Sequence, residues 1–207
     1  MELQEFFDVF YRNILNTTWL EVVAVLFGLL SVWFAKKENI LVYPTGIISV
    51  LIYVYICLFA GLYADMGINA FYFVMSVYGW YKWTRKDNRD RVIPISRNNT
   101  MQHMISIAGT VAFFFILRYV LTNFTDSTVP NWDSATTAIF IVGMWLMALK
   151  KIENWIFWII GDLVSIPLYF HKGLLLTSFQ FIVFLILAVS GYLEWRKSLK
   201  RTDEQAG

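Results

Sequence analysis

A hydrophobic pattern of three segments occurs twice in this chain, in the same direction, with one further apolar segment between the two copies. The stretches 28–46 (GLLSVWFAKKENILVYPTG) and 143–161 (GMWLMALKKIENWIFWIIG) share a Gly, a Lys-Lys pair, a Glu-Asn pair and a second Gly seven residues later. The third segments also match, since 76–83 reads SVYGWYKW and 188–195 reads AVSGYLEW. Membrane proteins built from repeats commonly bind their solute between the repeats, near the middle of the bilayer. The pattern therefore favours a membrane transporter.

The composition indicates a protein that is embedded almost wholly in a membrane. Of its 207 residues, 58% are hydrophobic and only 15% are charged, whereas about a quarter of a soluble domain is charged. The single cysteine, Cys57, lies in an apolar run, which excludes a disulfide framework. The first ten residues are acidic and lack a small-residue cleavage site, so no cleavable signal peptide is predicted.

Seven segments are apolar enough to cross a membrane, for which roughly 20 mainly apolar residues are needed. They are 19–35, 40–60, 63–83, 103–121, 135–149, 155–171 and 174–195. Two parallel repeats of three helices must enter the membrane from the same side, so an unpaired helix has to lie between them. The predicted fold class is therefore an all-α integral membrane protein with seven transmembrane helices in a 3+1+3 parallel repeat.

The division of the chain follows from these spans. We expect an extracytoplasmic N-terminal segment, a first three-helix bundle, a cytoplasmic loop, a linker helix, a second three-helix bundle and a cytoplasmic tail. Their bounds are, in that order, 1–18, 19–83, 84–102, 103–121, 135–195 and 196–207.

The distribution of basic residues predicts the orientation. Fourteen Lys and Arg residues fall on one side of the predicted spans and three, Arg12, Arg118 and Lys172, on the other. Short loops rich in Lys and Arg stay in the cytoplasm, which puts the N-terminus outside and the C-terminus inside. The basic loop 84–102 could instead bind nucleic acid or lipid, but topology explains it with no further assumption. We therefore expect the lipid bilayer as a partner and no nucleic acid.

Polar residues within the spans gather on helix faces. An ionisable group at the centre of a membrane helix costs roughly 2.5–3.5 kcal/mol on insertion scales, so such groups usually face a cavity or a partner. In the sixth span Trp155, Trp158, Asp162, Ser165 and Tyr169 recur at steps of three and four residues, which places them on one face. Further candidates are Tyr43 in the second span, Asn69 and Tyr72 in the third, and Gln180 in the seventh.

The tryptophans divide into two groups. Trp155 and Trp158 share a face with a carboxylate, and two indoles with an acid suit a planar cationic ring, at roughly 0.5–2 kcal/mol per cation–π contact. Five others lie near span ends and are predicted to sit in the interfacial belts: Trp19, Trp80, Trp83, Trp132 and Trp195.

The motifs of enzymes and pumps do not occur in this sequence. It contains no phosphate-binding loop, no cluster with metal-ligand spacing and no nucleophile with a matching base. We therefore expect no enzymatic activity, no cofactor and no metal, and an ATP-driven pump would need a separate subunit.

Three stretches resemble the Pnu-type vitamin transporters: 69–83 (NAFYFVMSVYGWYKW), 132–135 (WDSA) and 150–166 (KKIENWIFWIIGDLVSI). The resemblance extends from Thr18 to Trp195, and its most specific marks are the ENWxxW and YGW runs. The best-known members of that family carry nicotinamide riboside. The resemblance implies a fold similar to that of the SWEET sugar transporters and uniport across a bacterial inner membrane. A cytoplasmic kinase would trap the product by phosphorylation, as a step of NAD biosynthesis.

The resemblance also implies site residues. The ENWxxW run supplies Asn154 and the two tryptophans Trp155 and Trp158, which would stack on the substrate ring, and the amides of the third and seventh spans fall on Asn69 and Gln180. Asp162 departs from the family, whose nicotinamide riboside carriers often have Asn there. Thiamine-carrying relatives share the fold, so thiamine is the alternative substrate; homo-oligomerisation is left open. The predicted substrate-binding set is Trp155, Trp158, Asp162, Asn69, Gln180, Tyr72, Tyr43 and Asn154.

Overall fold

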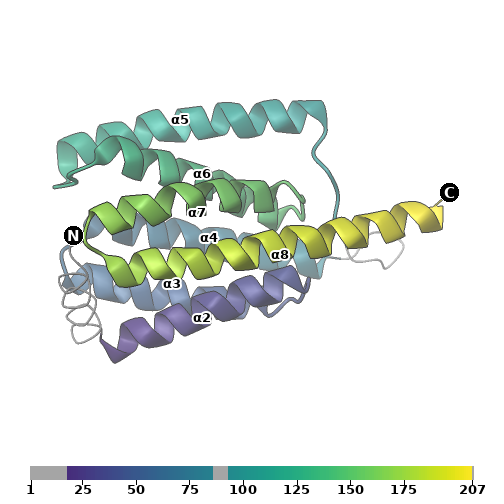
Figure 1. The fold of residues 1–207 in the computed structure, drawn as a ribbon, viewed down its shortest axis with the longest axis horizontal. Coiled ribbons are helices and arrows are strands. Elements are labelled where there is room, and N and C mark those ends of the chain that lie inside the picture. Colours follow the sequence, from purple (N-terminus) through teal and green to yellow (C-terminus); the bar gives the residue numbers. More distant parts are fainter. Residues whose placement is uncertain (1–17, 86–92, 207) are drawn as a thin grey trace.

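The computed structural model describes residues 18–85 and 93–206, which form seven helices (Figure 1). The helices are α2 (Trp19–Lys36), α3 (Val42–Phe59), α4 (Tyr63–Thr84), α5 (Thr100–Phe124), α6 (Pro130–Ala148), α7 (Asn154–His171) and α8 (Leu175–Ala206). The predicted segment 1–18 lies outside the described residues except for Thr18. Thr18 and Glu21 form a capping box that begins α2, so Glu21 serves the helix start.

Each predicted span is a helix, with some differences in length. Helix α6 begins at Pro130, five residues before the predicted start at 135, because proline suits the first turn of a helix. Helix α8 continues through the predicted tail to Ala206. Among the described helices, α2, α3, α5 and α8 are long and apolar enough to cross a membrane by themselves. Helices α4, α6 and α7 carry more polar side chains, and many of those face the interior.

Six helices form a closed ring, and α5 lies outside it, at the top of Figure 1. Helices α2, α3 and α4 pack in that order, as do α6, α7 and α8. Helix α2 also packs on α8, and α4 on α6, which joins the two bundles into a ring of six. Helix α5 packs on α6 from outside. The 3+1+3 arrangement places α3 and α7, the middle helices of the two bundles, opposite each other across the ring.

The backbone shows the register of the repeat. Glu38 and Lys150 both have a positive φ, of 54° and 52°, and Gly61 and Gly173 have φ values of 72° and 74°. In both pairs the residue numbers differ by 112, as they do for the matched segments 76–83 and 188–195. The predicted match of 28–46 with 143–161 is therefore wrong by three residues. The shared Lys-Lys and Glu-Asn pairs do not occupy equivalent backbone positions.

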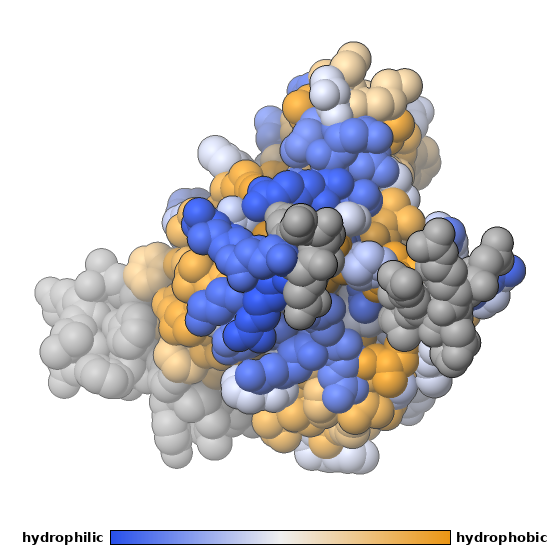
Figure 2. Space-filling model, turned by 90° about the vertical axis from the view of Figure 1, so that its right-hand side faces the viewer, coloured by the Kyte–Doolittle hydropathy of each residue, from blue (hydrophilic) through white to orange (hydrophobic). Residues whose placement is uncertain are grey.

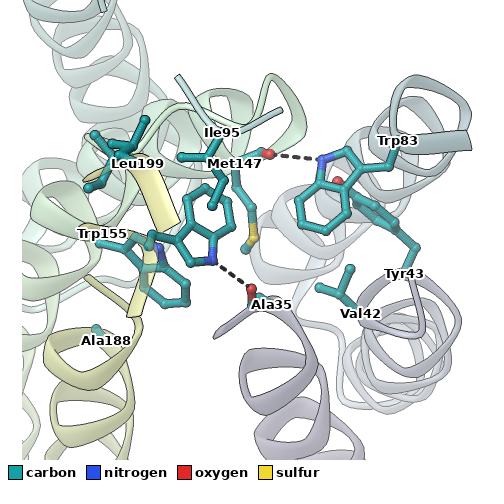
Figure 3. Close-up of a cluster of buried hydrophobic side chains, with 11 residues drawn as sticks. Ala35, Val42, Tyr43, Trp83, Ile95, Met147, Trp155, Ala188 and Leu199 are labelled. Carbon is teal, nitrogen blue, oxygen red and sulfur yellow. Dashed lines mark hydrogen bonds between the residues drawn. The ribbon is translucent and has the colours of Figure 1, made fainter. Parts of the chain in front are cut away.

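A reciprocal pair of tryptophans closes one end of the ring (Figure 3). The Trp83 indole N–H donates to the carbonyl of Met147 at 3.2 Å, and the Trp195 indole N–H donates to the carbonyl of Ala35 at 3.0 Å. Each acceptor is the penultimate residue of the first helix of the other bundle, and the two indole rings lie 6.1 Å apart. Each indole thus gives a second donor to a carbonyl at a helix end, beside the backbone N–H of Glu38 at Ala35 and that of Lys150 at Met147.

This arrangement corrects the prediction for two of the five tryptophans assigned to the interface. Trp83 is 4% exposed and Trp195 is 0% exposed, because they face the other bundle instead of lipid. Trp19, Trp80 and Trp132 are exposed, as predicted.

A second layer of contacts covers the tryptophan pair. The backbone of Ser96 pairs with the turn between α6 and α7, through Lys150 and Ile152. The hydroxyl of Ser198 donates to Glu38, whose carboxylate lies 3.9 Å from the Lys150 ammonium. Burial lowers the pKa of Lys150, and the Glu38 carboxylate partly opposes this. We refer to these contacts and the two tryptophans as the closure; its outer surface carries the hydrophilic side chains in Figure 2.

Candidate binding site

One face of α7 carries buried polar groups that lack partners. Among the described residues, no hydrogen bond is made by the indole N–H groups of Trp155 and Trp158 or by the Ser165 hydroxyl. Asp162 lies on the same face, is 2% exposed and makes no hydrogen bond or ion pair within the described part of the chain. Buried polar groups in proteins are nearly always paired, and leaving one unpaired costs about 1–3 kcal/mol. Four on one helix face are typical of a site that pairs them with a ligand.

Two of the predicted aromatic residues pack against the two tryptophans of the closure. Tyr43 and Trp155 occupy equivalent positions of the repeat, and their rings lie directly against Gly79 and Gly191, where any side chain would overlap them. The Tyr43 ring meets the ring of Trp83 edge-on at 5.2 Å, and Trp155 meets that of Trp195 edge-on at 5.5 Å. Trp155 is thus packed among protein rings and is not half of an open sandwich with Trp158.

Trp158 begins a ladder of four stacked rings. Its indole stacks on Phe140 at 5.3 Å with an interplanar angle of 28°, and Phe140 stacks on Phe181 at 6.0 Å and 9°. Phe181 then stacks on Tyr169 at 5.1 Å and 16°. The other described ring pairs are tilted or edge-on, at 47° or more. The ladder runs along α7 from Trp158, about one turn from the start of that helix, towards the end away from the closure.

The structure adds Phe140 and Phe181 to the residues that sequence reasoning found. A phenylalanine in an apolar span carries no signal of its own, so neither could be distinguished from lipid-facing residues. Phe140 lies against Gly161 on α7, where a side chain would overlap its ring. A Gly one residue before the only aspartate of that span is the sequence signal that marks the place.

The predicted polar residues divide between the ladder and other positions. Gln180 lies near the Tyr53 hydroxyl of the opposite bundle, and Tyr72 lies near Tyr169. Asn69 instead donates to the backbone carbonyl of Asp65 in its own helix, at 2.9 Å. Asn154 is fully buried at the start of α7, where it donates to the Lys151 carbonyl at 2.6 Å; its own side-chain oxygen has no partner.

An ion pair lies at the far end of the ladder. The Lys172 ammonium is 2.7 Å from the Asp133 carboxylate and 5.5 Å from the ring centre of Tyr169. Asp133 also accepts a hydrogen bond of 2.7 Å from the hydroxyl of Ser127. Among the described residues no group of three or more His, Cys, Asp or Glu side chains could hold a metal ion.

The site is a planar aromatic path beside a buried carboxylate, built from α6, α7 and α8 of the second bundle. Tyr53 and Tyr72 of the first bundle lie near it. The profile of the nicotinamide mononucleotide transporter family matches residues 18–197. The chain belongs to this family.

Curated relatives of the chain are transporters as well. The nicotinamide riboside transporter PnuC of Escherichia coli is 26% identical over 92% of this chain and 90% of its own length. PnuC of Neisseria mucosa is 27% identical, over 91% of this chain and 76% of the relative. The riboflavin/roseoflavin transporter RibM of Streptomyces davaonensis is 25% identical over 92% of this chain and 89% of the relative.

A solved structure agrees with the fold. The crystal structure of the vitamin B3 transporter PnuC matches with a TM-score of 0.72 and 27% identity, over 96% of this chain and 90% of that one. Members of this family move solutes across membranes, so the chain is a transporter and not an enzyme.

Proposed function

We propose that the chain carries nicotinamide riboside across the bacterial inner membrane by facilitated diffusion. The observation that carries the proposal is the buried, unpaired Asp162 one turn along α7 from the half-buried Trp158 ring. Nicotinamide riboside joins a planar cationic ring to a sugar. Trp158 and Phe140 offer ring faces and Asp162 offers the opposite charge, while Gln180 and Tyr53 suit the sugar hydroxyls.

Relatives of similar identity are named for different vitamins. The charge and the polar side chains of the site therefore have to distinguish between these solutes. The flavin ring of riboflavin is planar but uncharged, and a buried carboxylate gains little from it. Thiamine, the alternative predicted above, carries the required positive charge but lacks a ribose. A buried Asp162 beside Trp158 therefore favours the two cations over riboflavin, and Gln180 and Tyr53, which suit a ribose, favour nicotinamide riboside over thiamine.

The closure suggests how access alternates. With the Lys/Arg-rich end in the cytoplasm, the closure seals the cytoplasmic side, and the ladder leads inward from the outer side. Rocking of one bundle against the other would break the indole bonds of Trp83 and Trp195 and open the site to the cytoplasm. The sequence contains no phosphate-binding loop, so a separate cytoplasmic kinase that phosphorylates the product would make uptake directional.

We expect Asp162→Asn to weaken the binding of nicotinamide riboside by about 1–2 kcal/mol. Two opposite charges about 4 Å apart attract by roughly 4 kcal/mol at an effective dielectric of 20, and desolvation removes much of this. The reduced riboside, whose dihydropyridine ring is uncharged, should bind almost equally to both proteins. Calorimetric titration of the purified protein measures both ligands, with Glu204→Gln as the control, because Glu204 is an exposed acid in the last turns of α8. Equal losses for the cation and the neutral ligand would contradict the proposed role of Asp162.

A further inference from the structure

A second hollow lies outside the ring of six helices, where α5 packs on α6 beside α4. It has a volume of about 280 Å³, and its lining side chains are apolar. The residues that matter below are Phe71 and Met75 of α4, Ile105, Gly109 and Phe113 of α5, and Trp145 of α6. We refer to this hollow as the α5 groove. It does not belong to the site on α7, and its occupant is independent of the transported solute.

Gly109 keeps the groove open. A Cβ added there would lie 3.7 Å from Val142 of α6, an ordinary contact distance, so the position has space that glycine leaves unfilled. Helix α5 packs closely on α6 but has no comparable packing on α4. The groove is thus a slot between α4 and α5 with α6 as its floor, and it opens to the side of the molecule, within the span.

The lining and the size of the groove select its occupant. Small-molecule sites place a few polar groups among apolar ones to orient the ligand. The lining of the α5 groove is almost wholly apolar. A single alkyl chain is narrow, flexible and apolar, and it is the substance that surrounds this part of the protein.

A basic side chain lies beyond the groove, at the Lys/Arg-rich end of α4. Lys82 lies seven residues after Met75 on α4, so the two share a face, with Lys82 two turns nearer the Lys/Arg-rich end. Its ammonium lies 5.6 Å from the ring centre of Tyr78, and no described carboxylate pairs with it. Basic residues at a membrane surface attract anionic lipid headgroups, at about 1 kcal/mol per residue.

We propose that the α5 groove binds one acyl chain of an anionic phospholipid whose headgroup contacts Lys82. The lipid belongs to the leaflet at the Lys/Arg-rich end, because Ile105 lies five residues from the start of α5 at that end. The chain fills the slot between α4 and α5 that side-chain packing leaves open.

Native mass spectrometry of the delipidated protein titrated with phosphatidylglycerol tests the proposal. Gly109→Leu fills the groove, and Gly67→Leu is its matched control, because Gly67 is also helical and has no atom within 4 Å of an added Cβ. Wild type and Gly67→Leu should bind one more tightly held lipid than Gly109→Leu, whose affinity at this site should fall at least tenfold. Lys82→Gln should retain the chain but lose the preference for phosphatidylglycerol over phosphatidylcholine.

Equal lipid binding by Gly109→Leu and Gly67→Leu would overturn the proposal. A change in the number of protein copies per particle, with lipid binding unchanged, would assign the groove to a second copy and overturn it too. If Gly109→Leu does not fold, phosphatidylglycerol brominated in mid-chain provides a second measurement on the wild type. Such lipid should quench wild-type fluorescence more than that of Trp145→Phe, and equal quenching would contradict an acyl chain in the groove.

Discussion

Replacing Trp158 with alanine is expected to weaken the binding of nicotinamide riboside by on the order of 1–3 kcal/mol, the range for losing an aromatic stacking partner. This loss corresponds to roughly 5- to 150-fold in the dissociation constant. Trp158 is half-buried and, among the described rings, stacks on Phe140 alone, at 5.3 Å. A flat solute ring can therefore take a place in the stack beside it. Calorimetric titration of the purified variant measures the change.

Trp19→Ala is the control for Trp158→Ala, because Trp19 is 72% exposed at the start of α2 and takes part in none of the ring contacts of the ladder. Its affinity should match that of the wild type. The neighbour Phe140 offers a graded test, since Phe140→Leu keeps the volume but removes a ring face. An effect of Trp19→Ala equal to that of Trp158→Ala would show that the site lies on another helix.

Replacing Trp83 with alanine is expected to lower the free energy of unfolding by about 3–5 kcal/mol, as for other buried aromatic residues. The change deletes a ring that packs on Tyr43 and Trp195, and it removes the indole N–H bond to the Met147 carbonyl. Thermal unfolding in detergent measures the effect. Trp80→Ala is the matched control, because Trp80 lies one turn earlier on the same helix and is 40% exposed.

A second substitution separates the hydrogen bond of Trp83 from its packing. Trp83→Phe keeps most of the ring but removes the N–H. We expect a loss of about 0.5–1.5 kcal/mol, the net contribution of one hydrogen bond, because the Met147 carbonyl keeps the backbone N–H of Lys150 as a donor. The same substitution at Trp195 should have a similar effect, since the two indoles make equivalent bonds. If Trp80→Ala destabilised the protein as much as Trp83→Ala, the closure would not be a main source of stability.

The fold could be predicted from the sequence because the spans are long apolar runs. The predicted bounds 63–83 and 155–171 differ from those of α4 and α7 by one residue at one end. Helix α6 was predicted too short, because its first turn carries polar residues of the sequence PNWDS that hydropathy alone assigns to a loop. Helix α8 was predicted too short for the same reason, since its last turns are charged.

The register of the repeat could not be predicted from residue identity. The Lys-Lys and Glu-Asn pairs favour matching 28–46 with 143–161, whereas equivalent backbone positions differ by 112 in residue number. The equivalent positions are Glu38 and Lys150, whose shared property is a positive φ. The two side chains differ in charge, and nothing in the sequence marks a backbone dihedral at residues other than glycine.

The candidate site could be predicted in part. The face of α7 follows from helical spacing, and Trp158, Asp162 and Ser165 share it. The partners on that face come from other helices, as Phe140 and Phe181 do, and a single sequence carries no signal for contacts between helices. This lack of a signal for contacts between helices also explains the wrong predictions for Trp83 and Trp195, since a tryptophan near a helix end can face either lipid or another bundle.

Uptake of radiolabelled nicotinamide riboside into proteoliposomes tests the central claim most directly. With no ATP and no ion gradient, the label should enter protein-containing vesicles until the inner and outer concentrations are equal, and Trp158→Ala vesicles should require a higher substrate concentration for the same rate. Unlabelled riboflavin should compete poorly. Entry no faster than into protein-free vesicles, or accumulation that requires a sodium or proton gradient, would contradict facilitated diffusion of this riboside.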